Sequence, residues 1–407
     1  MVCNTVCKNG HSFRKTLTVI VFSLLLVFTF TSEHKAFAQS DETVIIAASD
    51  WQSPEGDNAC SKSFGKILQN IKNDGITHAD GFLFCGDYDY DGYGVDNAVS
   101  EGIAAIKEGL NGFADMENTV FAQGNHDTPA ATNGMSRSGN NDPKNGKYGV
   151  FVINNDDYMW RNSNEEKIVE TAKELKDYLL EKSEAKYKKP IFIVSHLPLH
   201  YSMRTFYDGD GMYAKHIFDL LNQGGKNGLN IVFLFGHNHS NGWDDYLGGS
   251  SVFLKKGDKI LIAQNSKTEY ETEKLSFTYM SAGYVGYYNN HNGADDTLTM
   301  TVFRIVGNEL VINRYSSTGL HPLKSSGVRN SYKNETAYQP NLTEYKSPQK
   351  LTLYEIERPK DDTINEDGKH EKGDKQTLGY GVPLVISIVV LILSSAGIII
   401  IKKKKKS

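Results

Sequence analysis

The spacing of apolar residues changes repeatedly along the first half of the chain. Short runs rich in β-branched and aromatic residues, typical of buried strands, alternate with stretches in which apolar residues recur every three or four positions, typical of amphipathic helices. The predicted strands cover residues 43–49, 82–85, 119–122, 191–194 and 231–235, and the predicted helices cover 60–72, 98–110, 165–180 and 212–221. Because strands and helices alternate, this part of the chain is predicted to form α/β layers.

The helical pattern ends by residue 248, and only strand patterns follow. They cover residues 251–254, 259–263, 277–280, 298–305 and 310–315, and residues 351–357 alternate like one further edge strand. A second, antiparallel sheet is therefore expected. We predict an α/β fold in which two mixed sheets pack face to face between outer helices, as a four-layer α-β-β-α sandwich. The predicted domain covers residues 43–357, with its core in residues 43–316.

Both ends of the sequence have patterns of segments outside this domain. Residues 1–38 begin with basic residues, continue as an uncharged apolar stretch and end at Ala36-Phe37-Ala38, which predicts a cleaved signal peptide; an uncleaved anchor is the alternative. Residues 358–378 are mostly charged or polar, which predicts a flexible stalk. Residues 379–401 are uncharged and apolar, and a polybasic tail, residues 402–407, follows them.

This C-terminal pattern predicts a transmembrane helix with a cytoplasmic tail, since about 20 apolar residues span a bilayer and lysines favour the cytoplasmic side. We therefore expect a single-pass type I protein of the cell membrane with an extracellular domain. The formal net charge is −5, and the lysine run at 402–406 is the only basic block, so the sequence has no signal for nucleic-acid binding.

Two cysteines, Cys60 and Cys85, remain once the signal peptide is removed. An oxidising compartment permits a disulfide between them. The apolar strand pattern around Cys85 favours two packed thiols instead. Both possibilities stay open.

Residues of metal-binding types follow five of the predicted strands. They are Asp50, Asp87, Asn125, His196, His237 and His239. Carboxyl ends of strands in an open α/β sheet are the usual place for ligands, so these side chains are expected to converge there. A mixture of carboxylate, amide oxygen and imidazole favours manganese, iron, zinc or cobalt over calcium.

A calcium loop is the competing interpretation of the residues after the second strand, where Asp87, Asp89 and Asp91 alternate before Gly92. An EF-hand loop needs a glutamate at its twelfth position, which is Ala98 here. The loop is also entered from a strand rather than a helix. These two departures favour the transition-metal site.

The strand-end motifs resemble those of the calcineurin-like metallophosphoesterase superfamily, over roughly residues 43–316. The motifs are Asp50-Trp51-Gln52, Gly86-Asp87, Gly124-Asn125-His126-Asp127, Ser195-His196 and Gly236-His237-Asn238-His239. The resemblance implies two ions of iron, manganese or zinc, the first held by Asp50 and His239, with Asp87 bridging them. The ligands that it implies for the second ion are Asn125, His196 and His237.

The same resemblance places His126 beside the ligand Asn125 without making it a ligand. His126 is then expected to face the substrate and to protonate the leaving group, and Asp127 is expected to fix its tautomer through the other ring nitrogen. These two residues are our predicted catalytic pair.

One motif departs from the family, which usually has Asp-x-His where this chain has Asp50-Trp51-Gln52. Purple acid phosphatases lack that histidine too and use the tyrosine of a Gly-Asp-x-x-Tyr motif, which Gly86 to Tyr90 match. Tyr90 as a tyrosinate ligand of ferric iron, a weakly bound Gln52 amide oxygen, or neither residue therefore remain as alternatives.

Together these patterns predict an extracellular, membrane-anchored enzyme with two metal ions that hydrolyses phosphate monoesters or diesters by attack of metal hydroxide. The alternative is a catalytically weak surface binding protein that retains the fold, because the first metal position lacks an expected ligand.

Overall fold

The computed structural model describes residues 42–52, 59–89, 97–127, 134–157, 165–201, 205, 209, 211–237, 239, 252–264, 266, 268–286, 298–321, 323–325, 343–345 and 349–352. The chain divides into two units, Met1–Ile356 and Glu357–Ser407. The second unit lies outside the described residues, and so do the predicted signal peptide, stalk, transmembrane helix and tail. Within the described part, no helix is both long enough and apolar enough to cross a membrane.

The larger sheet, which we call the first sheet, has eight strands in the order β15-β14-β13-β1-β2-β3, with β12 beside β13 and β18 beside β14. Its strands are β1 (Thr43–Ala48), β2 (Gly81–Phe84), β3 (Thr119–Phe121), β12 (Gly283–Tyr284), β13 (Thr299–Val306), β14 (Glu309–Ser316), β15 (Gly319–His321) and β18 (Gln349–Thr352). β1, β2 and β3 pair in parallel, whereas β13 runs antiparallel to β1. The carboxyl ends of β1, β2 and β3 therefore meet at one edge.

The second sheet has six strands in the order β4-β5-β6-β7-β11-β8. Its strands are β4 (Gly139–Asn140), β5 (Gly149–Ile153), β6 (Pro190–Ser195), β7 (Asn230–Phe235), β11 (Thr278–Ser281) and β8 (Phe253–Leu254). β5, β6, β7 and β11 are parallel, and the antiparallel β4 and β8 form the edges. Two further pairs, β9 (Lys259–Ala263) with β10 (Tyr270–Lys274) and β16 (Leu323–Ser325) with β17 (Thr343–Tyr345), lie outside the two sheets.

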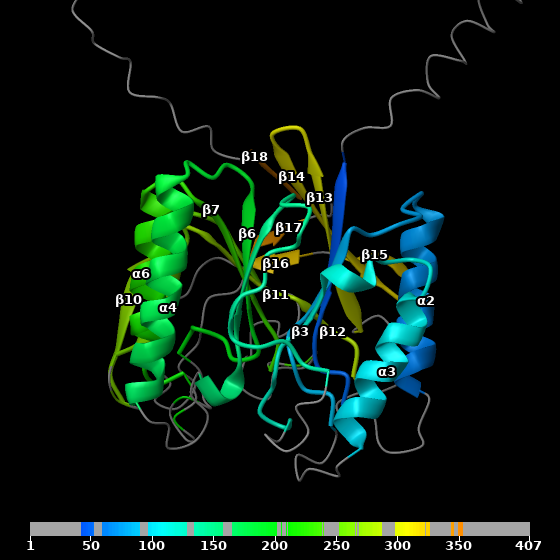
Figure 1. Cartoon of the computed structure of the whole chain (residues 1–407), viewed down its shortest axis with the longest axis horizontal. Coiled ribbons are helices and arrows are strands. Elements are labelled where there is room, and N and C mark those ends of the chain that lie inside the picture. Colours follow the sequence, from blue (N-terminus) through cyan, green and yellow to red (C-terminus); the bar gives the residue numbers. More distant parts are fainter. Residues whose placement is uncertain are drawn as a thin grey trace, which may run out of the picture. The chain divides into compact units, whose positions relative to one another are not determined.

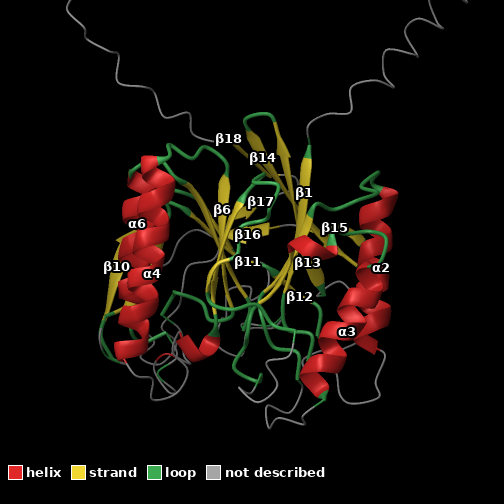
Figure 2. Ribbon diagram, viewed as in Figure 1, coloured by secondary structure: helices red, strands yellow, loops and turns green. Residues whose placement is uncertain are grey.

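Four long helices form the outer layers. α2 (Ala59–Asn73) and α3 (Ala98–Leu110) lie on one side, and α4 (Glu165–Glu184) and α6 (Ala214–Lys226) on the other, with the sheets between the two pairs (Figures 1 and 2). Short 3₁₀ turns, η1 (Met116–Asn118) and η3 (Asn155–Asp157), precede β3 and α4. The predicted four-layer sandwich is confirmed.

The apolar core has three layers that follow from strand alternation. In β1, Ile46 packs toward α2 and α3, whereas its neighbours Ile45 and Ala47 pack between the two sheets. A third cluster fills the space between the second sheet and helices α4 and α6. Cys60 belongs to the first layer and Cys85 to the middle one, and both are buried free thiols. The structure therefore has packed thiols rather than a disulfide.

Helix α6 is longer than the apolar spacing predicted, because it continues through Gly224 and Gly225. Glycine weakens a helix, so the sequence pattern appeared to end at residue 221. Packing explains both glycines: a Cβ on Gly225 would lie 2.1 Å from the carbonyl oxygen of Ser276, and one on Gly224 would lie 2.9 Å from Ile231 Cδ1. Close approach of the helix to the sheet therefore requires glycine at these positions.

Candidate metal centre

The ends of β1, β2 and β3 in the first sheet and of β6 and β7 in the second carry the predicted metal ligands. The first sheet contributes oxygen donors, namely Asp50, Asp87 and Asn125. The second sheet contributes imidazoles, namely His196, His237 and His239. All the oxygen donors therefore come from the first sheet and all the imidazoles from the second. An ion that binds both kinds of donor must contact both sheets.

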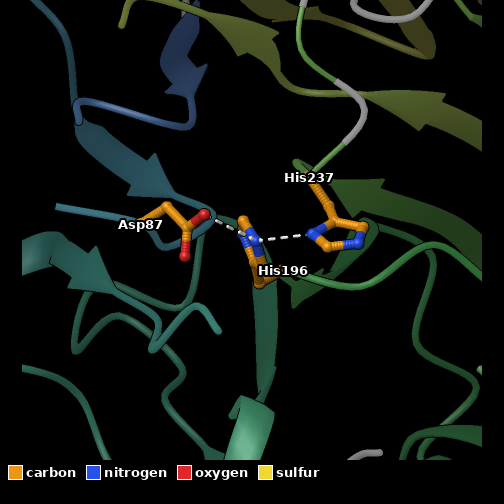
Figure 3. A group of neighbouring side chains, drawn as sticks. All are labelled: Asp87, His196 and His237. Atoms are coloured by element: carbon orange, nitrogen blue, oxygen red, sulfur yellow. Dashed lines mark hydrogen bonds and ion pairs between the residues drawn. The ribbon is translucent and has the colours of Figure 1, made fainter. Parts of the chain in front are cut away.

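Four of these residues form what we call the histidine-rich group: Asp87, Asn125, His196 and His237. Figure 3 shows His196 between Asp87 and His237, with Nε2 of His196 3.2 Å from Asp87 Oδ2 and 3.2 Å from His237 Nδ1. The Asn125 Oδ1 atom lies 2.9 Å from His196 Nε2 and 2.8 Å from His237 Nδ1. These four donor atoms thus lie close together.

The other residues form the carboxylate-rich group, which consists of Asp50, Asp87, His239 and Gln52. Ligand atoms of Asp50, Asp87 and His239 lie within 4.8 Å of one another, and His239 Nε2 lies 3.3 Å from Asp50 Oδ1. Gln52 Nε2 lies 3.1 Å from Asp87 Oδ2. Asp87 belongs to both groups, and its Oδ2 atom contacts His196 on one side and Gln52 on the other.

The backbone at this centre is strained. Six non-glycine residues among the described ones have positive φ, and five of them are Asp50 (55°), Gln52 (39°), Asp87 (62°), His237 (67°) and His239 (38°). Such conformations cost on the order of 1–3 kcal/mol each and persist only where the surroundings hold them. Their concentration at one place marks a functional site rather than a packing feature.

Hydrogen bonds between strand ends hold the strained loops. The Asp50 backbone N–H donates to Gly86 O at 2.9 Å, and Trp51 N–H donates to Asp87 O at 2.7 Å. Between the two sheets, the His237 N–H donates to both carboxylate oxygens of Asp50 at 3.1 Å. His196 Nδ1 lies 2.7 Å from Cys85 O. Donation to that carbonyl fixes the tautomer and leaves Nε2 of His196 for a ligand.

Asp127 supports the loop that carries Asp87. Its Oδ2 atom accepts from Gly124 N–H at 2.7 Å and from Asp87 N–H at 2.9 Å, and its Oδ1 atom accepts from Tyr88 N–H at 2.8 Å. This arrangement differs from the predicted one, in which Asp127 binds the ring of His126. The two oxygens already hold backbone amides, and the buried Nδ1 of His126 has no hydrogen-bond partner in the described structure. Asp127 is therefore a positioning residue.

Burial and mutual charge set the protonation of this cluster. Burial lowers the pKa of His196, but the carboxylates of Asp87 and Asp50 outweigh it and raise that pKa to about 9. Burial raises the pKa of Asp87, whereas His196 and His126 lower it more strongly, so Asp87 stays ionised. Burial and the Asp87 charge raise the pKa of Asp127 to about 7. A cation that binds here must displace the proton on His196.

The family model of the calcineurin-like phosphoesterases matches residues 43–241. Residues 43–241 belong to the calcineurin-like phosphoesterase family. The matched segment contains both ligand groups, His126 and Asp127.

Comparisons with whole proteins find little sequence similarity. No curated protein matches the chain. A solved structure described as GAP50, the anchor in the inner membrane complex of Plasmodium, is 13% identical with a TM-score of 0.42, over 77% of this chain and 90% of that one. A dimetal phosphatase from Danio rerio is 11% identical with a TM-score of 0.39, over 69% of this chain and 98% of that one.

The candidate ligand residues in the matched segment fit two cations. Atoms about 2.1 Å from one ion and at right angles around it lie about 3 Å apart, and the donor contacts in the histidine-rich group span 2.8 to 3.2 Å. Asn125 Oδ1 carries lone pairs, and His196 Nε2 and His237 Nδ1 each have one when they carry no proton. A single proton on His196 Nε2 cannot satisfy all three contacts. A shared cation would satisfy them together.

Tyr90 lies outside the described residues, so the tyrosinate ligand stays a prediction. Asp91 and Gly92 of the alternative calcium loop lie outside them as well. Gln52, by contrast, is completely buried at the centre. Sequence reasoning missed the carbonyl of Cys85 as the partner of His196, since a backbone contact between distant strand ends has no side-chain signature.

Proposed function

We propose that this protein is an extracellular, membrane-anchored phosphoesterase that hydrolyses phosphate monoesters or diesters with two metal ions. One observation carries the proposal. Donor atoms from five strand ends of two sheets form two buried groups that share Asp87. Two nearby cations lower the pKa of a water molecule that they share and screen the phosphoryl oxygens during displacement. Iron, manganese and zinc all suit this mixture of donors.

The chain's own groups have distinct tasks in this proposal. Asp50, Asp87, Asn125, His196, His237 and His239 hold the ions. His126 lies beside Asn125, and its backbone N–H donates to Asp87 Oδ1 at 2.9 Å. We assign His126 the protonation of the leaving oxygen, because the buried Nδ1 atom of its ring has no hydrogen-bond partner in the described structure. Asp127 holds Asp87 and His126 through the loop backbone.

The proposed location rests on the sequence pattern at both ends of the chain. The predicted signal peptide at 1–38, the predicted membrane helix at 379–401 and the lysines that follow it would put residues 43–357 outside the cell. Protease added to intact cells should remove the folded domain and leave the tail protected. Complete protection of the domain in intact cells, with digestion after lysis, would contradict the proposed orientation.

A surface binding protein without turnover is the second candidate, and Gln52 favours it. Gln52 stands where the family usually has a histidine, so one metal position has a weaker ligand. Release of p-nitrophenol from p-nitrophenyl phosphate, with manganese, iron or zinc added, separates the two candidates. Normal metal content without release of product from any ester would favour the binding protein.

The central test is metal analysis of the full-length protein with a panel of phosphate monoesters and diesters, repeated for Asp87→Ala. We expect the variant to lose both ions and about 10³-fold in kcat/KM, equivalent to about 4 kcal/mol. Asp115→Ala is the matched control, because Asp115 is a half-exposed carboxylate that pairs with His78 at 3.2 Å. An Asp87→Ala protein that keeps its ions and its activity would refute the proposal.

A further inference from the structure

The carboxylate-rich group contains an unusual buried amide. Gln52 is 0% exposed, and its Nε2 atom donates to Asp87 Oδ2 at 3.1 Å. The other end of the same amide, Oε1, is buried and has no hydrogen-bond donor in the described structure. A buried carbonyl oxygen without a donor costs about 1–3 kcal/mol. The oxygen of an amide whose nitrogen contacts Asp87 has a lone pair that a cation could use.

The backbone supports a specific role for this side chain. Gln52 has φ of 39°, and its N–H lies 3.3 Å from Asp87 O. Glutamine rarely adopts positive φ, so the local fold maintains an unfavourable conformation that directs this amide at Asp87. A side chain that only filled space would need neither the strained backbone nor the polar contact.

Both ligand groups contain carboxylate, imidazole and amide side chains. The histidine-rich group combines Asp87, His196 and His237 with the amide oxygen of Asn125. The carboxylate-rich group combines Asp50, Asp87 and His239 with the amide of Gln52. Asn125 Oδ1 contacts two imidazoles, whereas Gln52 contacts a carboxylate. The amide in the second case therefore stands among hard oxygen donors.

We propose that Gln52 takes the place of the missing histidine and binds the metal ion through Oε1. This position is then the site of lower affinity, and it prefers hard ions. The inference rests on the proposed two-metal function. A neutral amide oxygen binds borderline ions such as zinc less tightly than imidazole does, whereas it suits manganese or magnesium. One ion is then held tightly by the histidine-rich group, and the other exchanges more readily.

The test is manganese titration of the full-length protein, with stoichiometry from elemental analysis after gel filtration and the nuclearity from electron paramagnetic resonance. Wild type should bind two ions in separate steps and give the spectrum of a coupled pair. Gln52→Ala should weaken only the second step, by about 10- to 100-fold, and give the six-line spectrum of a single ion. Gln52→His should tighten that step for zinc.

Gln123→Ala is the matched control. Gln123 is another buried glutamine beside the centre, but its amide is satisfied, because Nε2 donates to Asp127 O and Asp156 Oδ2 and Oε1 accepts from Asp156 N–H. This variant should be less stable and still bind two ions. Weakening of both steps in Gln52→Ala would show that Gln52 only orients Asp87, which overturns the inference.

Two ions bound with unchanged affinity in Gln52→Ala would also overturn it and would leave Tyr90 as the remaining candidate. A charge-transfer band in iron-loaded wild type that disappears in Tyr90→Phe would assign the position to tyrosinate. A different experimental result would contradict the proposed function. A wild-type protein that binds two ions in separate steps and hydrolyses no ester would refute the enzyme and leave the role of Gln52 intact.

Discussion

The two sheets contribute different chemistry to one centre. The first sheet supplies carboxylates and amides, from Asp50 to Asn125, and the second supplies the three imidazoles. Each ligand group needs both, since His196 and His237 meet Asp87 and Asn125, and His239 meets Asp50. Neither sheet alone therefore supplies a complete ligand group. The face-to-face packing of the sheets is what creates the site.

The sharpest way to break this arrangement is to remove an imidazole of the second sheet. His196→Ala should lose the ion of the histidine-rich group and about 10³-fold in kcat/KM, about 4 kcal/mol, because His196 Nε2 contacts both Asp87 and Asn125. His216→Ala is the matched control, since His216 lies on α6 and pairs with Glu165 at 3.3 Å. Equal activity in the two variants would show that the second sheet contributes no essential ligand.

Metal removal tests whether the ions connect the sheets. An ion that binds only the folded protein stabilises it by about 2.7 kcal/mol at a concentration 100 times its Kd. We expect a chelator to lower the free energy of unfolding of wild type by about that amount for each ion lost, measured by urea denaturation. Asp87→Ala should not respond to the chelator. The same response in both proteins would mean that the chelator acts elsewhere.

The sequence predicted most of the residues that meet at the candidate centre, because they follow strands that are recognisable one at a time. Asp50, Asp87, His196 and His237 each come within three residues of a buried strand, and the parallel order of strands brings them together. The second sheet was predicted to be antiparallel and to consist of the strands after residue 248. In the structure β5, β6, β7 and β11 are parallel in that sheet, whereas β13 and β14 belong to the first sheet. β6 and β7 have the same local pattern as β1 to β3, and β5 was not predicted. Pairing partners are not encoded in one strand's periodicity.

The role of Asp127 could not be predicted for the same reason. Its contacts are with the backbone amides of Gly124, Asp87 and Tyr88, and two of these residues lie about 40 positions away in the sequence. Its neighbour His126 was the obvious partner by sequence, yet adjacent residues point in different directions. Local motifs identify the residue types at a site, and tertiary packing decides which of them meet.

Two buried histidines with opposite charge behaviour follow β6 in the second sheet. His196 meets carboxylates of the first sheet, and its pKa is raised to about 9. His200 Nδ1 forms a hydrogen bond of 2.6 Å with the Tyr279 hydroxyl group, and its ring packs edge-on against Phe235. Burial alone lowers the pKa of His200 to about 3, from an ordinary value of 6.5. The surroundings of His196 therefore favour its protonated form, whereas those of His200 favour the neutral form.

We expect the folded protein to lose stability in acid, because His200 stays neutral when it is buried. This is the smallest of the expected effects. Between pH 6.5 and 3 the unfolded chain binds a proton at this position that the folded protein excludes, so stability is present above pH 6.5 and is lost as the pH falls. Lowering the pH from 7.5 to 5.5 should reduce the free energy of unfolding of wild type by about 1.4 kcal/mol through this residue.

The variant His200→Gln keeps a hydrogen-bond acceptor for Tyr279 and cannot titrate. Urea unfolding of both metal-free proteins at pH 7.5 and 5.5 should therefore show a smaller loss in the variant, since the other groups titrate alike in both. Equal losses would mean that His200 takes up a proton as readily in the folded protein as in the unfolded chain, and that the second sheet does not hold its two histidines in opposite charge states.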